Sequence, residues 1–116
     1  MNSYTPPTLG FAVIYRWRLH RAREEAFIEA WAQVTHAIRD QCGGLGSRLH
    51  RGDDGVWLAY AQWPSRAMWD DASLTDPALQ RARKQMREAI AETLPDIPLS
   101  PVADLLVPVT TPASYD

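Results

Sequence analysis

The stretch that decides the fold runs from Gly55 to Ser73 and is GVWLAYAQWPSRAMWDDAS. Its first half alternates with a period of two, which predicts a β-strand that ends at Trp63, and the following Pro64-Ser65 pair turns the chain into a short helix. Both faces of this strand are largely apolar, whereas a solvated antiparallel sheet has one polar face. We therefore expect a cover on each side of the sheet. The two faces carry Trp57, Ala59, Ala61 and Trp63 on one side and Val56, Leu58, Tyr60 and Gln62 on the other.

Patterns before this stretch predict the first half of the domain. The segment Gly10–Leu19 is rich in β-forming residues and predicts a strand. A long helix is expected over Arg21–Cys42, where two glycines end it. Leu45–Arg51 predicts a short strand that pairs with the following one across the turn Gly52–Gly55. The apolar stripe of the long helix consists of Phe27, Ala30, Trp31, Val34, Ala37 and Ile38.

The segment after the stretch predicts one more helix and one more strand. Asp76 and Pro77 are typical of a helix start, as the N-cap and the first helical residue. The three prolines within Leu94–Pro101 argue against regular structure there, so the last strand is expected over Val102–Val107. The core stripe of this helix is expected to be Leu79, Ala82, Met86, Ile90 and Thr93.

The resulting order is strand, helix, strand, strand, helix, strand, with the second helix broken in two. This order predicts an α+β fold of the ferredoxin-like βαββαβ type, a four-stranded antiparallel sheet with its helices on one face. We expect a flexible arm over residues 1–9, one domain over 10–109 and a tail over 110–116. Because the helices cover one sheet face only, the other face predicts a homodimer formed by two facing sheets. The alternative is a monomer whose arm or tail covers that face.

The composition is that of an ordinary globular protein, with 46% hydrophobic and 22% charged residues. A net charge of −2 argues against nucleic acid or an anionic membrane as a partner. A single cysteine excludes an intrachain disulfide, and the sequence shows neither a leader pattern nor an apolar run long enough to cross a bilayer. These features together predict a cytoplasmic protein.

Metal and thiol chemistry find little support in the sequence. His20, His36 and His50 lie in three different predicted elements, without a second ligand at metal-binding spacing. Cys42 lies at a helix C-terminus, where the helix dipole opposes a thiolate. We therefore expect a structural thiol and neither a metal nor an organic cofactor.

The remaining candidates for chemistry are aromatic. The chain has five tryptophans, and each of them taken alone is more typical of a core. Trp63 at a strand end and Trp69 in the next helix form an exception, because Arg83 on the following helix is expected to approach the same end of the sheet. A flat aromatic ligand between helices and sheet fits such a lining, and an arginine there stabilises an oxyanion.

These residues resemble a known family, the antibiotic biosynthesis monooxygenase (ABM) domain of the dimeric α+β barrel superfamily. The resemblance covers Gly10–Val107 and is most specific in EEAFIEAW (Glu24–Trp31), in LGSRLHRGDDGVWLAYAQW (Leu45–Trp63) and in the Trp-Pro-Ser turn. It implies the ferredoxin-like fold and the dimer of facing sheets. Some members resemble cofactor-free oxygenases that convert anthrones to quinones with dioxygen, whereas others degrade haem.

The resemblance also implies site residues. A pocket tryptophan matches Trp63, a pocket aromatic that is often tyrosine matches Trp69, and a pocket arginine matches Arg83. One departure is Ala59, which stands where the oxygenases carry a hydrogen-bonding asparagine. The haem degraders carry a histidine near Arg83 and an asparagine in the first strand, and this chain has neither, which disfavours haem degradation.

The sequence thus leads to two hypotheses. The first is a homodimeric, cofactor-independent monooxygenase that oxidises a small aromatic or quinol-type substrate with O2. Its catalytic candidates are Arg83, for the substrate oxyanion, and Tyr15 and Tyr60, for proton transfer. The second is a non-catalytic homodimer that binds a small hydrophobic metabolite. The candidates for substrate binding are Trp63, Trp69, Trp31 and His50.

Overall fold

The computed structural model describes residues 10–107. The expected arm over 1–9 and tail over 110–116 therefore lie outside the described residues. Two 3₁₀ turns, Arg21–Arg23 and Pro77–Leu79, precede the two longer helices. The strands and helices are β1 (Phe11–Leu19), α1 (Glu24–Cys42), β2 (Ser47–Arg51), β3 (Trp57–Trp63), α2 (Arg66–Asp70), α3 (Gln80–Ala89) and β4 (Ile90–Leu99).

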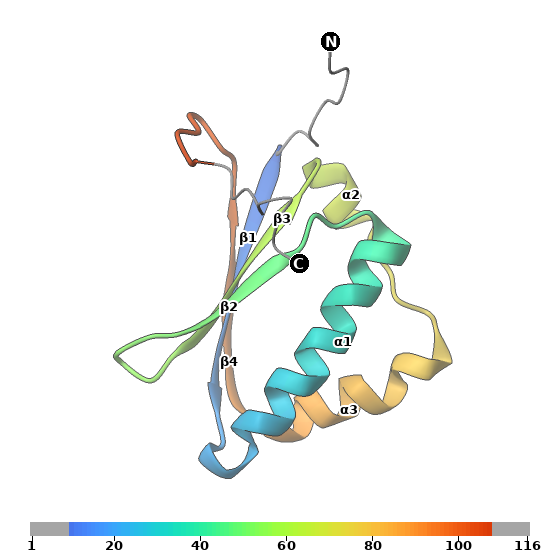
Figure 1. Ribbon diagram of the computed structural model, residues 1–116, viewed down its shortest axis with the longest axis vertical. Coiled ribbons are helices and arrows are strands. Elements are labelled where there is room, and N and C mark those ends of the chain that lie inside the picture. Colours follow the sequence, from blue (N-terminus) through green and yellow to red (C-terminus); the bar gives the residue numbers. More distant parts are fainter. Residues whose placement is uncertain (1–9, 108–116) are drawn as a thin grey trace, which may run out of the picture.

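The four strands form one antiparallel sheet in the order β2-β3-β1-β4, and the three helices lie on one side of it (Figure 1). This arrangement confirms the predicted ferredoxin-like fold. Strands β1 and β3 are central, and their register places Phe11 opposite Trp63 and Trp17 opposite Trp57. The side of the sheet that faces the helices is called the inner face below, and the other side is called the outer face.

Local sequence signals explain the ends of the helices. Gly43 follows α1 with a φ of 80°, a left-handed conformation that favours glycine, and its N–H donates to the Ile38 carbonyl. Ser65 precedes α2, and its hydroxyl accepts a hydrogen bond from the Met68 N–H. Asp76 likewise accepts from the Ala78 N–H, as the predicted helix start requires.

The last strand lies elsewhere than predicted. The expectation of a helical stripe through Ile90 and Thr93, irregular chain over Leu94–Pro101 and a strand over Val102–Val107 is wrong. The backbone becomes extended at Ile90, and β4 pairs along β1 from there to Leu99. Prolines within the strand are tolerated because β4 is an edge strand, where half of the N–H groups need no partner. Residues 102–107 have no regular structure.

The core lies between the inner face and the helices, in two clusters. One cluster centres on Phe27, which is fully buried and packs edge-on against Trp17 at a ring distance of 5.1 Å. The other joins Phe11, Val13 and Trp63. Ala59 is buried in the first cluster, beneath the helices. The space between the two clusters is the site described next.

Candidate functional site

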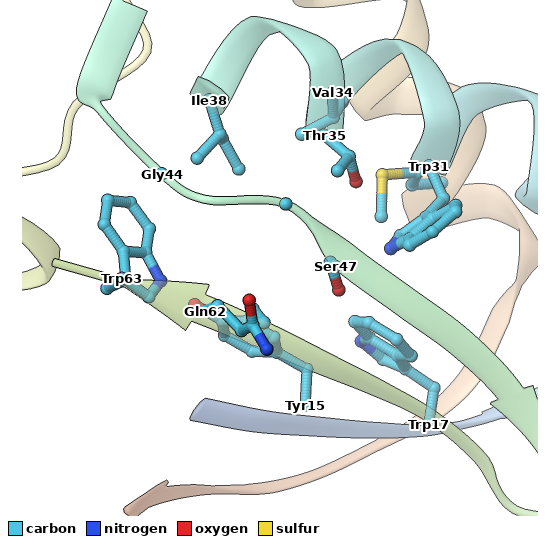
Figure 2. A pocket seen from close by; sticks show the side chains of 13 residues that line it. Tyr15, Trp17, Trp31, Val34, Thr35, Ile38, Gly44, Ser47, Gln62 and Trp63 are labelled. Atoms are coloured by element: carbon cyan, nitrogen blue, oxygen red, sulfur yellow. The ribbon is translucent and has the colours of Figure 1, made fainter. Parts of the chain in front are cut away.

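A cavity of about 230 Å³ lies between α1 and the inner face (Figure 2). Helix α1 forms one wall through its predicted stripe, and the sheet forms the opposite wall. Aromatic and aliphatic side chains together make up most of the lining, which is typical of a site for a small apolar ligand. The lining residues are Tyr15, Trp17, Trp31, Val34, Thr35, Ile38, Gly44, Gly46, Ser47, Ala61, Gln62, Trp63 and Met86.

Small residues keep this cavity open. Ala61 on β3 lies beneath it, with a side chain too short to fill the gap between α1 and the sheet. Gly44, between α1 and β2, packs so closely that a Cβ there would lie 2.9 Å from the Ile38 side chain. Bulky residues at the same positions would close the space that the surrounding tryptophans leave.

A second hollow adjoins the cavity on the side of α2. Both share Tyr15, Ile38 and Trp63, so these side chains stand between them. The second hollow differs in character because Arg83 contributes a positive charge to it. Its lining residues are Tyr15, Ile38, Cys42, Trp63, Trp69, Ala72, Ser73, Leu74 and Arg83.

A hydrogen bond fixes the boundary between the two spaces. The Trp69 indole N–H donates to the Tyr15 hydroxyl at 2.8 Å, and the Trp69 ring also packs against Phe11. Burial raises the pKa of the Tyr15 phenol, the bond from Trp69 opposes that shift, and the charge of Asp96 adds to it. The phenol therefore stays protonated at neutral pH. Because its oxygen already accepts from Trp69, its own O–H is available as a donor.

Arg83 is an exposed residue of α3 that reaches back across the second hollow. Its Nη1 donates to the Leu74 carbonyl at 3.1 Å, which ties α3 to the segment after α2. A guanidinium carries five N–H donors, so this bond leaves others for an anion in the hollow. The residue thus adds a positive charge to a hollow that is also lined by Tyr15, Trp63 and Trp69.

The structure brings four of the predicted site residues together and a fifth close by. Tyr15, Trp63, Trp69 and Arg83 line the second hollow, and Trp31 lines the adjoining cavity. Tyr60 and His50, by contrast, lie on the outer face. Tyr60 pairs with Ile14 and Arg48, His50 pairs with Leu58, and both side chains line a wide depression there. The structure does not bring these two residues to Trp63.

Several lining residues were absent from the sequence prediction. Ser47 is the most informative, because its hydroxyl is buried without a hydrogen-bond partner among the described residues. The alternation of β2 contains the signal, since the tight turn to β3 fixes Ser47 opposite Ala61 and hence on the inner face. Trp17 and Met86 also line the cavity, and the sequence predicted only a core position for Met86.

Within residues 10–107, no group of three His, Cys, Asp or Glu side chains is placed to hold a metal ion. None of the helices in the described part of the chain combines the length and the apolar character that a membrane crossing needs.

Comparison with known proteins identifies the family. The sequence model for antibiotic biosynthesis monooxygenases matches residues 10–85. This chain belongs to the ABM family. The match runs from the start of β1 into α3, so it includes Tyr15, Trp63, Trp69 and Arg83. A sequence comparison with curated proteins finds no match to this ABM protein.

Solved structures share the ABM fold. SnoaB, a cofactor-independent oxygenase from Streptomyces nogalater, is 17% identical with a TM-score of 0.65, over 84% of this chain and 98% of its own. A Streptomyces coelicolor monooxygenase in complex with nanaomycin D is 22% identical with a TM-score of 0.67, over 89% of this chain and 96% of its own. Rv0793 from Mycobacterium tuberculosis is 20% identical with a TM-score of 0.64, over 83% of this chain and 98% of its own. At these identities the likeness concerns the fold.

Proposed function

We propose that this ABM protein is a cofactor-independent monooxygenase that oxidises a small planar aromatic or quinol-type substrate with O2. The observation that carries the proposal is the aromatic cavity that adjoins a hollow holding Tyr15 and Arg83. Family membership supports it, as do the similar folds of SnoaB, a cofactor-independent oxygenase, and of the monooxygenase bound to nanaomycin D.

The proposed chemistry draws its electrons from the substrate. An anthrone-type methylene loses a proton, and the resulting anion transfers an electron to O2. The carbon then exchanges its two C–H bonds for one C=O bond, while the second oxygen atom leaves as water. Because dioxygen is the oxidant and the substrate is the reductant, no further redox partner enters the balance.

The site residues divide this work by their chemistry. Trp31 and Trp63 pack against the planar rings. Arg83 stabilises the substrate anion, since a fixed positive charge beside a developing negative charge lowers the barrier. Tyr15 stays protonated and therefore acts as a hydrogen donor to the reacting oxygen rather than as a base. Tyr60 and His50 have no part in this scheme because they lie on the outer face.

Oxygen uptake tests the proposal. Purified protein without added cofactor is assayed against anthrones and hydroquinones, and we expect uptake that saturates with substrate. Arg83→Ala should lower kcat/KM about a hundredfold, because it removes charge stabilisation of the anion. Arg81→Ala is the matched control, since Arg81 is an exposed arginine of the same helix and lines neither space. Equal losses in both variants would remove Arg83 from the site.

A non-catalytic binding protein is the second candidate function. Ala59 favours it, because the family resemblance implies a hydrogen-bonding asparagine in the oxygenases at the position where this chain has a buried, apolar side chain. This candidate predicts that the same compounds quench tryptophan fluorescence in a saturable way without any oxygen uptake. That outcome would overturn the oxygenase proposal and leave the cavity as a binding site.

We further propose that the protein is a homodimer whose outer faces pack together. Ile97 and Leu99 on β4 are each 36% exposed, and they pair across the strand boundary with Ile14 and Ala12. Leu106 lies beside this face and remains 73% exposed, whereas Ala12 of the same face is 2% exposed, so the face is covered in part. Apolar surface of this kind on one sheet face is typical of an interface.

A further inference from the structure

The proposed oxidation needs a base, and the residues that line the two spaces do not supply one. Among residues 10–107, no Asp, Glu or His lines the cavity or the second hollow. Tyr15 stays protonated, and Arg83 carries a positive charge. The Cys42 thiol donates to the Ser73 carbonyl at 3.6 Å, so it keeps its proton as well. The group that accepts the proton from the substrate carbon therefore lies outside the two linings.

A β-bulge in β4 places one carboxylate beside Tyr15. The pairing of β4 with β1 shifts by one residue at this point, so that Pro95 and Asp96 both stand opposite Tyr15. The Arg16 Nη2 donates to the Pro95 carbonyl at 3.1 Å, which fixes the bulge. Residues that stand opposite each other in an antiparallel pair share a face of the sheet. The bulge thus sets Asp96 on the inner side, next to Tyr15.

The electrostatics of Asp96 agree with this placement. Its negative charge is one cause of the raised pKa of the Tyr15 phenol. Asp96 is an exposed residue of an edge strand, yet burial of part of its surface raises its own pKa above the ordinary value of 3.8. Within residues 10–107 no cation forms a salt bridge with it. A carboxylate that is unpaired and has a raised pKa binds a proton more strongly, which suits a general base.

We propose that Asp96 is the general base of this site and takes the proton of the substrate carbon through one bridging water molecule. The inference rests on the proposed function and deepens it, because it supplies the base that the oxidation needs. A water is part of the scheme because Asp96 stands beside the linings and belongs to neither of them. Tyr15 keeps its own O–H for the reacting oxygen.

The balance of protons and electrons closes around this carboxylate. The water gives a proton to Asp96 as it accepts the C–H proton, and the electron pair of that bond stays on the carbon. After electron transfer to O2 the carbon forms a C–O bond, and the peroxide anion takes the proton back from Asp96. Loss of the second C–H proton to Asp96 forms the C=O bond as the O–O bond breaks. The hydroxide that leaves takes this proton and becomes water, which restores the carboxylate.

Exchange of substrate protons tests this role without oxygen. Anthrone is incubated with the protein in D2O under anaerobic conditions, and mass spectrometry follows the uptake of deuterium at its methylene carbon. We expect the wild type to accelerate this exchange over the solution without protein. Asp96→Asn should lower the acceleration about a hundredfold. Glu92→Gln is the matched control and should leave it unchanged, since Glu92 is a carboxylate of the same strand that stands opposite Arg18 and forms a salt bridge with it.

Two companion measurements separate proton transfer from a structural role. Quenching of tryptophan fluorescence by anthrone measures binding, and we expect equal affinity in the wild type and in Asp96→Asn. Asp96→Glu keeps a carboxylate and moves it outward by one methylene group. This variant should therefore retain more of the exchange rate than Asp96→Asn, which a merely structural role of Asp96 would not require.

Several outcomes would overturn the inference. They are a wild type that does not accelerate exchange, an exchange rate that Asp96→Asn leaves unchanged, an equal loss in Glu92→Gln, or a loss of affinity that accounts for the loss of exchange. If Asp96→Asn does not fold, the wild type and Asp96→Glu still decide. Exchange that depends on Asp96 without any oxygen uptake would overturn the proposed oxygenase only, whereas uptake with exchange that is independent of Asp96 would overturn the role of Asp96 only.

Discussion

The inner and outer faces of the sheet come from alternate residues of the same strands, yet they carry different kinds of side chain. In β1, Tyr15 faces the cavity and bonds to Trp69, while its neighbours Ile14 and Arg16 face away from the helices. The inner face combines large aromatic rings with small residues, which leaves a shaped space. The outer face combines apolar side chains with arginines, which favours contact with another surface. Under the proposed function, one strand serves a binding site with one face and an assembly interface with the other.

The largest expected effect concerns the core on the inner side. Phe27→Ala removes a fully buried ring that packs against Trp17 and Trp57, and we expect it to lower the free energy of unfolding by about 3–5 kcal/mol. The adjacent Ile28 is 41% exposed, so Ile28→Ala should lower it by less than about 1 kcal/mol. Urea denaturation measures both values. Similar losses in the two variants would contradict the assignment of the helix faces.

The next effect concerns assembly through the outer face. Leu58→Glu places a charge among the apolar groups of that face, opposite Arg16 and His50, and we expect the dimer Kd to rise about thirtyfold or more. Sedimentation velocity over a range of concentrations measures the change. Quenching of tryptophan fluorescence by the assayed aromatic compounds serves as the control, because the cavity lies on the other side of the sheet. A wild-type protein that is monomeric at all concentrations would remove the proposed interface.

A smaller effect separates two tyrosines that face opposite ways. Tyr15→Phe leaves the Trp69 N–H without its acceptor, and we expect a loss of about 1–2 kcal/mol in stability together with a lower kcat. Tyr60→Phe removes a hydroxyl from the outer face and should leave kcat unchanged. Oxygen uptake and urea denaturation test both variants. A fall in kcat in Tyr60→Phe alone would reverse the roles assigned to the two faces.

The smallest effect is a dependence of stability on pH. Burial raises the pKa of Tyr15 above its ordinary value of 10.0, so the folded chain keeps a proton that the unfolded chain releases. The stabilisation that comes from the buried neutral phenol is fully present at pH values below the ordinary pKa. It is lost as the pH rises through the pKa that the phenol has in the folded chain. The free energy of unfolding should therefore fall more steeply between about pH 9 and pH 11 in the wild type than in Tyr15→Phe. Parallel curves would show that the phenol is not protected by burial.

The fold was predictable where burial alone sets the pattern. The stripe of α1 and the alternation of β3 follow from the packing of one face, and the structure confirms both elements. The position of β4 was not predictable from the sequence. Prolines oppose a strand unless it lies at the edge of a sheet, and a single sequence does not show which strand lies there.

The site was predictable only in part, for reasons that lie in three dimensions. Trp63, Trp69 and Arg83 follow from their spacing around a strand end, and the structure does place them around one hollow. Tyr60 and His50 were chosen by chemical type although they fall on the outer side of their strands. Ser47 was missed because the fold decides which residues surround its hydroxyl, and hence whether that hydroxyl has a hydrogen-bond partner. The cavity itself depends on the small size of Gly44 and Ala61, which leaves space between α1 and the sheet.

The prolines of β4 also limit edge-to-edge pairing between sheets of neighbouring molecules. A strand at the border of a sheet ordinarily offers free N–H and C=O groups to any passing strand, which is a common start of aggregation. Pro95 and Pro98 lack N–H groups, so this border is a poor template for another strand. The opposite border, β2, has only five residues. Because neither edge strand offers a long run of free N–H groups, sheets of neighbouring molecules gain little by pairing edge to edge. Growth into fibres is therefore disfavoured relative to a dimer.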